Sequence, residues 1–245
     1  MKKTILLSSL FAVGAAFATT VESGNAVGAL DKQISTSDAT QILISVPFLG
    51  YDGEAVKVAE MVKTSNLDTG SKLYVPDGNG KYNTWKLNAS GQWVADKQVV
   101  IGADGTPSSE GQSASQGTVG VNRGDAFWLE PVFKNGESSD TIFLLGQGSD
   151  AGISTAVKNC WNLIGNASIA DKTIEKATIE GKDGDQIIVQ VDGLLRYYTY
   201  TTDKGWRYKE KGQWKSYPLV IKAGQGFWYK YASTDSEENT KTIHW

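Results

Sequence analysis

The sequence predicts an all-β fold of two pseudo-symmetric repeats, each with about six short strands in a barrel-like or sandwich-like arrangement. Three observations lead to this prediction. Apolar residues alternate over short segments, glycine-rich turns separate these segments, and a Phe-Trp motif occurs twice, in NRGDAFWL at 122–129 and in KAGQGFWY at 222–229. Similarity at a spacing of a hundred residues indicates a repeated unit.

Residues 1–18 have the features of a secretory signal peptide. Lys2 and Lys3 give a positive start, an apolar run continues to Phe17, and the small residues at 16 and 18 suit cleavage near Ala18. No later run approaches the roughly 20 apolar residues that a membrane helix needs. We therefore expect a secreted protein, in the periplasm or at the exterior of the cell envelope, with no transmembrane segment after cleavage.

The first repeat is expected over residues 19–139. Its strands are predicted in QILISVPF, SKLYVPD, KYNTWKL, GQWVAD and DAFWLEP, with TIFLLG just after residue 139 as the sixth strand of the unit, and they show alternating or short apolar runs. Ala55, Val58 and Met61 have helical spacing and predict one short helix. Residues 101–120 are rich in Gly and Ser and predict a long, solvated loop inserted into this repeat.

The second repeat is expected over residues 140–245. Strands are predicted in WNLIGN, DQIIVQV, RYYTY, GWRYKE, QGFWYKY and TIHW, and Ile174 and Ala177 have the spacing of a second short helix. Segment 81–85 of the first repeat aligns with 196–200 of the second. We expect Phe127 and Phe227 to be buried, and strand alternation then places Trp228 nearer to solvent.

The segment WNLIGN at 161–166, followed by GQGFW at 224–228, resembles the WNLIGNP and GQGFW repeat modules of secreted and surface proteins of Gram-negative bacteria. The first repeat has the related LISVPF at 43–48 and GDAFW at 124–128. The resemblance implies a non-catalytic extracellular β module. Ala167 replaces the proline of the motif, which concerns only the local turn.

Composition excludes several classes of function. The formal net charge is −3, from 24 basic and 27 acidic residues, and such a surface repels nucleic acid. Cys160 is the one cysteine, so an internal disulfide cannot form. His244 is the one histidine, and a zinc site needs three or four nitrogen or sulfur ligands. We therefore predict no metal site and no cofactor.

Three further motifs suggest chemistry but have simpler interpretations. Cys160 and His244 lack the sequence signature of a nucleophile and its base. The turns at 77–80 and 183–185 carry Asp and Asn, yet the Glu that closes a calcium loop is missing. Arg123-Gly124-Asp125 spells an adhesion tripeptide, but the matching turn of the second repeat reads Ala-Gly-Gln. We expect structural turns at these places.

A surplus of aromatic residues remains, and it is concentrated at 205–217. Trp206, Tyr208, Trp214 and Tyr217 alternate there with basic residues. These rings can cover sheet edges, or they can form a platform that stacks on a glycan or anchors a surface protein. We interpret the chain as a secreted, non-catalytic binding or structural module with these four candidate ligand-binding residues. The alternative is a secreted hydrolase of the glycosidase type that uses a pair of carboxylates.

Overall fold

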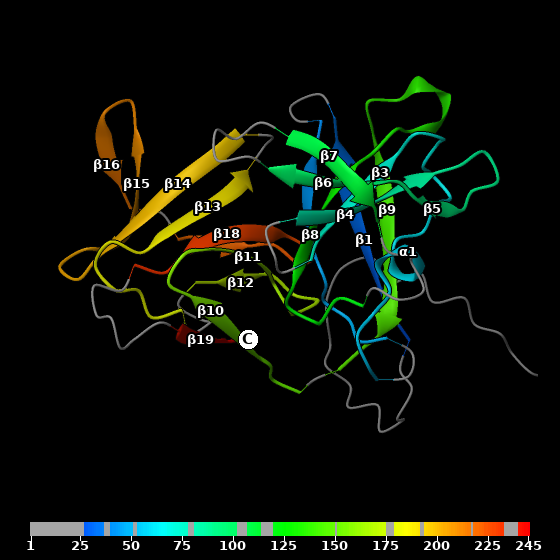
Figure 1. The fold of residues 1–245 in the computed structure, drawn as a ribbon. Coiled ribbons are helices and arrows are strands. Elements are labelled where there is room, and N and C mark those ends of the chain that lie inside the picture. Colours follow the sequence, from blue (N-terminus) through cyan, green and yellow to red (C-terminus); the bar gives the residue numbers. More distant parts are fainter. Residues whose placement is uncertain are drawn as a thin grey trace, which may run out of the picture.

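The structure is a computed structural model that describes residues 27–245, except for 37–39, 51–52, 78–80, 102–106, 114–119, 150, 175–178, 192–193, 217 and 233–239. The predicted signal peptide at 1–18 therefore lies outside the described residues, as do Ala177 of the second predicted helix and the candidate residue Tyr217. The prediction of an all-β fold is confirmed (Figure 1).

The first half of the chain forms a seven-stranded antiparallel sheet in the order β2-β8-β3-β4-β6-β7, with β5 paired to β4, and a separate pair β1-β9. Its elements are β1 (Val27–Ser35), β2 (Ile42–Ser45), α1 (Val58–Met61), β3 (Lys72–Pro76), β4 (Lys81–Leu87), β5 (Trp93–Ala95), β6 (Lys97–Ile101), β7 (Pro107–Gln112), β8 (Ala126–Glu130), η1 (Lys134–Gly136) and β9 (Ser139–Gln147).

The second half forms a six-stranded antiparallel sheet in the order β11-β18-β13-β14-β15-β16 and the two-stranded pairs β10-β19 and β12-β17. Its elements are β10 (Ser154–Lys158), β11 (Trp161–Gly165), β12 (Lys172–Thr173), β13 (Gln186–Val191), β14 (Leu194–Thr201), β15 (Gly205–Glu210), β16 (Gln213–Lys215), β17 (Val220–Ile221), β18 (Gly226–Lys230) and β19 (Thr240–His244). No sheet formed by the described strands closes into a barrel, so the barrel-like alternative is wrong for them.

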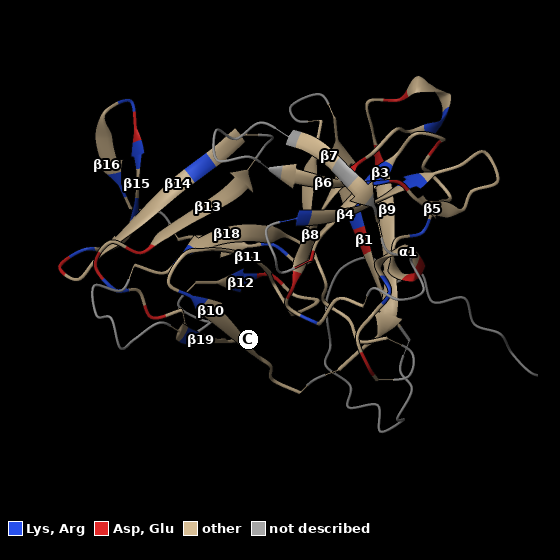
Figure 2. Ribbon diagram, viewed as in Figure 1, with Lys and Arg blue, Asp and Glu red and all other residues tan. Residues whose placement is uncertain are grey.

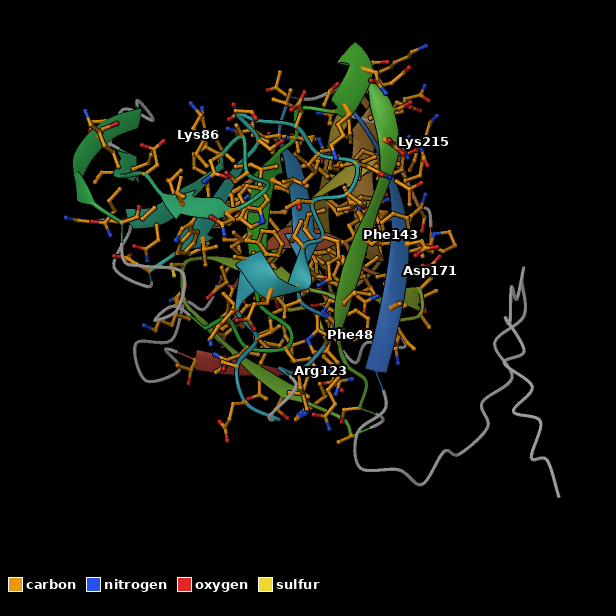
Figure 3. The ribbon with its side chains drawn as sticks, turned by 90° about the vertical axis from the view of Figure 1, so that its right-hand side faces the viewer. Phe48, Lys86, Arg123, Phe143, Asp171 and Lys215 are labelled. Carbon is orange, nitrogen blue, oxygen red and sulfur yellow. The ribbon has the colours of Figure 1, made fainter. Side chains whose placement is uncertain are left out.

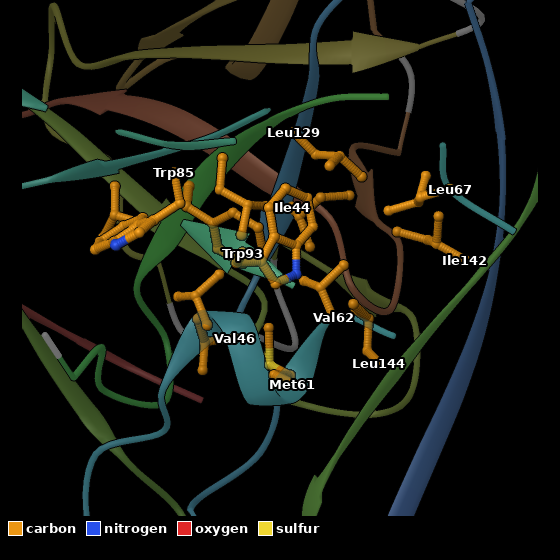
Figure 4. Packing of buried hydrophobic residues seen from close by; sticks show 14 of the residues in the cluster. Ile44, Val46, Met61, Val62, Leu67, Trp85, Trp93, Leu129, Ile142 and Leu144 are labelled. Atoms are coloured by element: carbon orange, nitrogen blue, oxygen red, sulfur yellow. The ribbon is translucent and has the colours of Figure 1, made fainter. Parts of the chain in front are cut away.

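Each half has its own hydrophobic core between its large sheet and one two-stranded pair, which is β1-β9 in the first half and β10-β19 in the second. In the first core, Trp85 and Leu129 of the sheet pack with Ile142 and Leu144 of β9 (Figure 4). In the second, the sheet packs against Val157 of β10 and Ile243 of β19. The predicted boundary between residues 139 and 140 therefore falls at the start of a strand that packs in the first core.

The two halves pair their strands in the same way. In the first, Ile44 lies opposite Phe127, and in the second, Ile164 lies opposite Phe227. Both Phe side chains are fully buried, as predicted. The order β2-β8-β3-β4 of the first sheet matches β11-β18-β13-β14 of the second, and the pair β1-β9 matches β10-β19. Common ancestry of the halves stays a prediction.

The sequence alignment of β4 with β14 is displaced by two residues from the observed pairing. Trp85 lies opposite Leu73, and the residue opposite the matching Ile187 is Tyr198. Trp85 thus corresponds to Tyr198, whereas the sequence alignment pairs it with Tyr200. The Tyr-rich segment tolerates either alignment, because similar residues recur every two positions along it.

The repeated glycine turns join the halves to each other. The amide of Ser45 in β2 donates to the Gly224 carbonyl at 3.1 Å, and the amide of Gly165 in β11 donates to the Gly124 carbonyl at 2.8 Å. Both turn glycines have positive φ, +93° at Gly124 and +67° at Gly224, a conformation that other residues rarely adopt. The glycine turn of each half therefore accepts a backbone hydrogen bond from the first strand of the other half's large sheet.

One prediction about local structure needs correction. The segment 101–120 is not a loop throughout, because residues 107–112 form strand β7 on the edge of the first sheet, and Ser113 is buried where its hydroxyl accepts the Thr84 amide. The Gly and Ser content of this segment is typical of a loop, but an edge strand can also be polar when it buries few side chains. The short helix predicted in the first repeat is observed as α1, which spans four residues, whereas the one predicted at 174–177 lies largely outside the described residues.

Candidate functional site

The structure divides the predicted aromatic cluster between two faces of the six-stranded sheet. Trp206 and Tyr208 are 8% and 6% exposed and belong to the second core. The Trp206 ring contacts the rings of Tyr200 and Tyr229, at centroid distances of 5.4 and 6.4 Å. These two candidates stabilise the core, and they do not form a surface platform.

Trp214 lies on the opposite face of the sheet and is 50% exposed. It pairs with Lys209 across β15 and β16, and the guanidinium carbon of Arg207 lies 5.4 Å from its ring centroid. Because successive residues of a strand face opposite sides, Arg207 and Lys209 share the face of Trp214, and Trp206 and Tyr208 do not. The structure thus brings Trp206 and Tyr208 together and places Trp214 apart from both.

The face that carries Trp214 bears a continuous band of apolar and aromatic side chains. Cross-strand pairs join Leu163 to Trp228, Trp228 to Ile188 and Ile188 to Tyr197. The register of β14 and β15 then places Lys209 beside Tyr197, and Lys209 pairs with Trp214. The band thus crosses six strands, a span of about 24 Å. We call it the outer face: Trp161, Leu163, Gln186, Ile188, Gln190, Leu195, Tyr197, Thr199, Arg207, Lys209, Trp214, Trp228 and Lys230.

The outer face is accessible and carries positive charge. Tyr197 is 60% and Trp161 is 39% exposed, and the second core lies on the other side of the sheet with β10 and β19 (Figure 1). Three of these described residues, Arg207, Lys209 and Lys230, are basic and none is acidic, and Figure 2 marks basic residues on β15. The Lys230 ammonium lies 5.9 Å from the Trp161 ring centroid. Cations here lie beside aromatic rings, where they stay attractive to anions.

Sequence reasoning missed most of the outer face, although strand alternation contains the signal for it. Once Phe227 is assigned to the core, Trp228 must face the other way, and the same rule places Tyr197 opposite to Tyr198. To find the whole outer face, alternation must be followed across neighbouring strands, and this requires knowing the order in which the strands pair. The concentration of aromatic residues at 205–217 drew attention to one hairpin only.

The aspartates of the turn at 183–185 serve the fold. Asp185 is fully buried, where it accepts hydrogen bonds from the Tyr229 hydroxyl at 2.5 Å and the Ala232 amide at 2.9 Å, and Lys241 lies 3.6 Å from it. Burial, together with the Asp185 carboxylate, raises the pKa of Tyr229. Asp183 accepts bonds from the amide and hydroxyl of Thr202. Among the described residues no group of three or more His, Cys, Asp or Glu side chains could hold a metal ion.

The remaining motifs are also structural. Arg123 donates to the carbonyls of Ala167 at 2.8 Å and Ala151 at 2.7 Å, so it fastens its turn to the second half (Figure 3). Burial raises the pKa of Asp125, whose carboxylate accepts the amide of Asn122. Cys160 is exposed, and His244 shares a 2.8 Å hydrogen bond with Ser154 on the outermost pair of strands.

The fold and surface define the chain as an all-β protein of antiparallel sheets with an aromatic, basic sheet face. No family model, curated protein or solved structure matches it. None of the helices in the described part of the chain has the length and apolar character to cross a membrane.

Proposed function

We propose that this protein is a secreted, non-catalytic module that binds an acidic polysaccharide along the outer face. The observation that carries the proposal is the unbroken band from Leu163 to Trp214, which combines exposed aromatic rings with three basic residues and no acidic one. Flat rings stack on the apolar faces of sugars, and the cations attract carboxylates or sulfates on the chain.

The shape of the outer face supports an extended ligand. The exposed rings of Trp161, Tyr197 and Trp214 belong to three different strands and are spread over the sheet. An extended sheet surface suits a polymer that contacts several points at once, since weak contacts at each point add up along one chain. Arg207 holds one side of the Trp214 ring, while the ring remains half exposed to a ligand.

Affinity electrophoresis in gels that contain polygalacturonate tests this proposal. Replacing both Tyr197 and Trp214 with Ala should reduce retention at least tenfold, because two aromatic contacts of more than about 1 kcal/mol each are removed. The thermal midpoint should change little, since both side chains are at least half exposed. Val94→Ala, at an exposed apolar position of the first sheet, is the matched control and should bind like the parent.

Three results would contradict the proposal. Unchanged retention of the double variant would remove the outer face as the binding surface. Equal retention by a neutral glucan gel would remove the role of the basic residues. Hydrolysis of chromogenic glycosides by the purified protein would replace the binding module with the carboxylate-dependent hydrolase.

A further inference from the structure

A cavity opens beside the hairpin β13–β14, on the side of the sheet opposite to the outer face. Its volume is about 200 Å³. Tyr198 and Leu219, both nearly fully buried, contribute to its wall, and Val191 and Pro218 add further apolar surface. This volume is below the roughly 300 to 1,000 Å³ of sites for drug-sized ligands, so the cavity fits one ring-sized group.

Among the described residues, two cations and no carboxylate line this pocket. Arg196 reaches it from β14 and Lys222 from the turn before β18. The Arg196 guanidinium carbon lies 5.7 Å from the Tyr208 ring centroid, which holds the side chain in place. Arg196 forms no ion pair among the described residues; it shares one hydrogen bond with Tyr198, and the nearby Glu210, which its charge also affects, is paired with Lys215. The guanidinium therefore retains donors for a ligand.

The polar rim of the pocket is fixed by the repeated turn. Gln225 accepts the amide of Lys222 at 2.9 Å and donates to the Gln190 carbonyl at 2.5 Å. These bonds connect the turn that carries Lys222 to strand β13. The backbone that carries Lys222 is therefore held beside β13 before any ligand binds, and a preorganised backbone loses less entropy on binding.

We infer that this pocket binds a small carboxylate with a compact apolar body. The planar fork of an arginine matches a carboxylate in bidentate geometry, and Lys222 adds a second positive charge. The wall of Val191, Pro218 and Leu219 suits an apolar ring or short branched chain and excludes a polymer. The inference does not depend on the proposed polysaccharide binding, because Arg196 and Tyr198 point away from the outer face.

Titration with benzoate and cyclohexanecarboxylate tests the inference, with calorimetry for affinity and NMR shifts of the Val191 and Leu219 amides for location. Both compounds should bind and shift these amides. Arg196→Gln should weaken binding at least tenfold, and Arg196→Lys by less, since charge remains but the fork is lost. Lys222→Ala should also weaken binding, and Lys86→Gln, at an exposed position of the first sheet, should not.

Lys222 is exposed, so its variant stays informative if the Arg196 variants prove unstable. Absence of shifts at these amides with tens of millimolar of either carboxylate would overturn the inference. So would equal affinity of the parent and the Lys222→Ala variant. Binding of neutral benzamide or inorganic phosphate as tightly as benzoate would assign the pocket to a different class of ligand.

Discussion

The two large sheets share a strand order but present different outer sides, and the difference is clearest at positions 130 and 230. Glu130 of β8 lies opposite Lys72, and Lys230 of β18 lies opposite Gln186, the equivalent residue of the second sheet. The Glu130 carboxylate accepts bonds from the Tyr74 hydroxyl at 2.7 Å and from Lys72 at 3.2 Å. In the second sheet the same position carries a cation beside an exposed ring.

The electrostatics of Glu130 show how the first sheet uses its polar groups internally. Burial acts to raise the pKa of Glu130, but hydrogen bonds from Tyr74, Gln41 and Lys72 outweigh it, and the pKa lies below its ordinary value. The Tyr74 ring is thereby fixed to a carboxylate. Among the described residues of the second sheet, no carboxylate lies on the outer face, so the rings and cations there are not engaged by one. One framework thus supports two different surfaces.

The largest expected effect tests what the halves share. Phe127→Ala and Phe227→Ala should each lower the free energy of unfolding by about 3 to 5 kcal/mol, since both rings are fully buried. Chemical denaturation measures both. Trp228→Ala, next to Phe227 but on the outer face, should cost clearly less. A loss under about 1 kcal/mol at either Phe would show that the two cores are not built alike.

A smaller effect concerns Lys32 of β1, which lies against the turn of Gly224, as Thr155 of β10 lies against the turn of Gly124. Burial, and then the positive charge of Lys222, lower the pKa of Lys32 from 10.5 to about 8. Below pH 8 the lysine is charged in both the folded and unfolded states, and its buried charge lowers the stability of the folded state. Between pH 8 and 10.5 the folded protein alone loses the proton, so stability should rise with pH.

Lys32→Thr, which copies the residue of the second half, should remove this rise. The stability of the parent relative to the variant should increase by roughly 1 to 2 kcal/mol between these pH values, after allowance for the partial exposure of the lysine. Urea denaturation at pH 7.5 and pH 10 measures the difference. Both proteins contain the same buried tyrosines, so the effect of these tyrosines on stability at high pH cancels when the parent is compared with the variant. A constant difference would mean that water reaches Lys32 freely.

The smallest expected effect comes from a substitution that makes the outer face of the second sheet resemble the equivalent side of the first sheet. Lys230→Glu places the residue of the first sheet in the second and should reduce retention by polygalacturonate roughly fivefold, as expected for one surface charge worth about 1 kcal/mol. The reduction should shrink at high salt, because screening weakens surface charges. Lys230→Gln should give about half the change in free energy. A stronger retention after Lys230→Glu would reverse the assigned role of charge.

The sequence was sufficient for the fold class, for most strands and for the burial of Phe127 and Phe227, because these follow from alternation along one segment. The location of the aromatic surface was not predictable in this way. Trp206 and Tyr208 look like a platform in their own hairpin, and only the packing of β10 and β19 on that side makes them core residues. The strand at 107–112 escaped prediction because pairing with β6 defines it, and its Ser and Gly residues favour a loop.

The exchanged glycine turns have a consequence for how this protein unfolds. The Gly224 carbonyl accepts the amide of Ser45 at the end of β2, and the Gly124 carbonyl accepts the amide of Gly165 at the end of β11, so neither half retains all of its backbone hydrogen bonds when the other melts. Two cores that depend on each other in this manner should melt in a single cooperative transition, although their sizes would allow two independent domains. Each half on its own would expose an unpaired strand edge, and a fragment of either half should therefore aggregate or pair with a second copy.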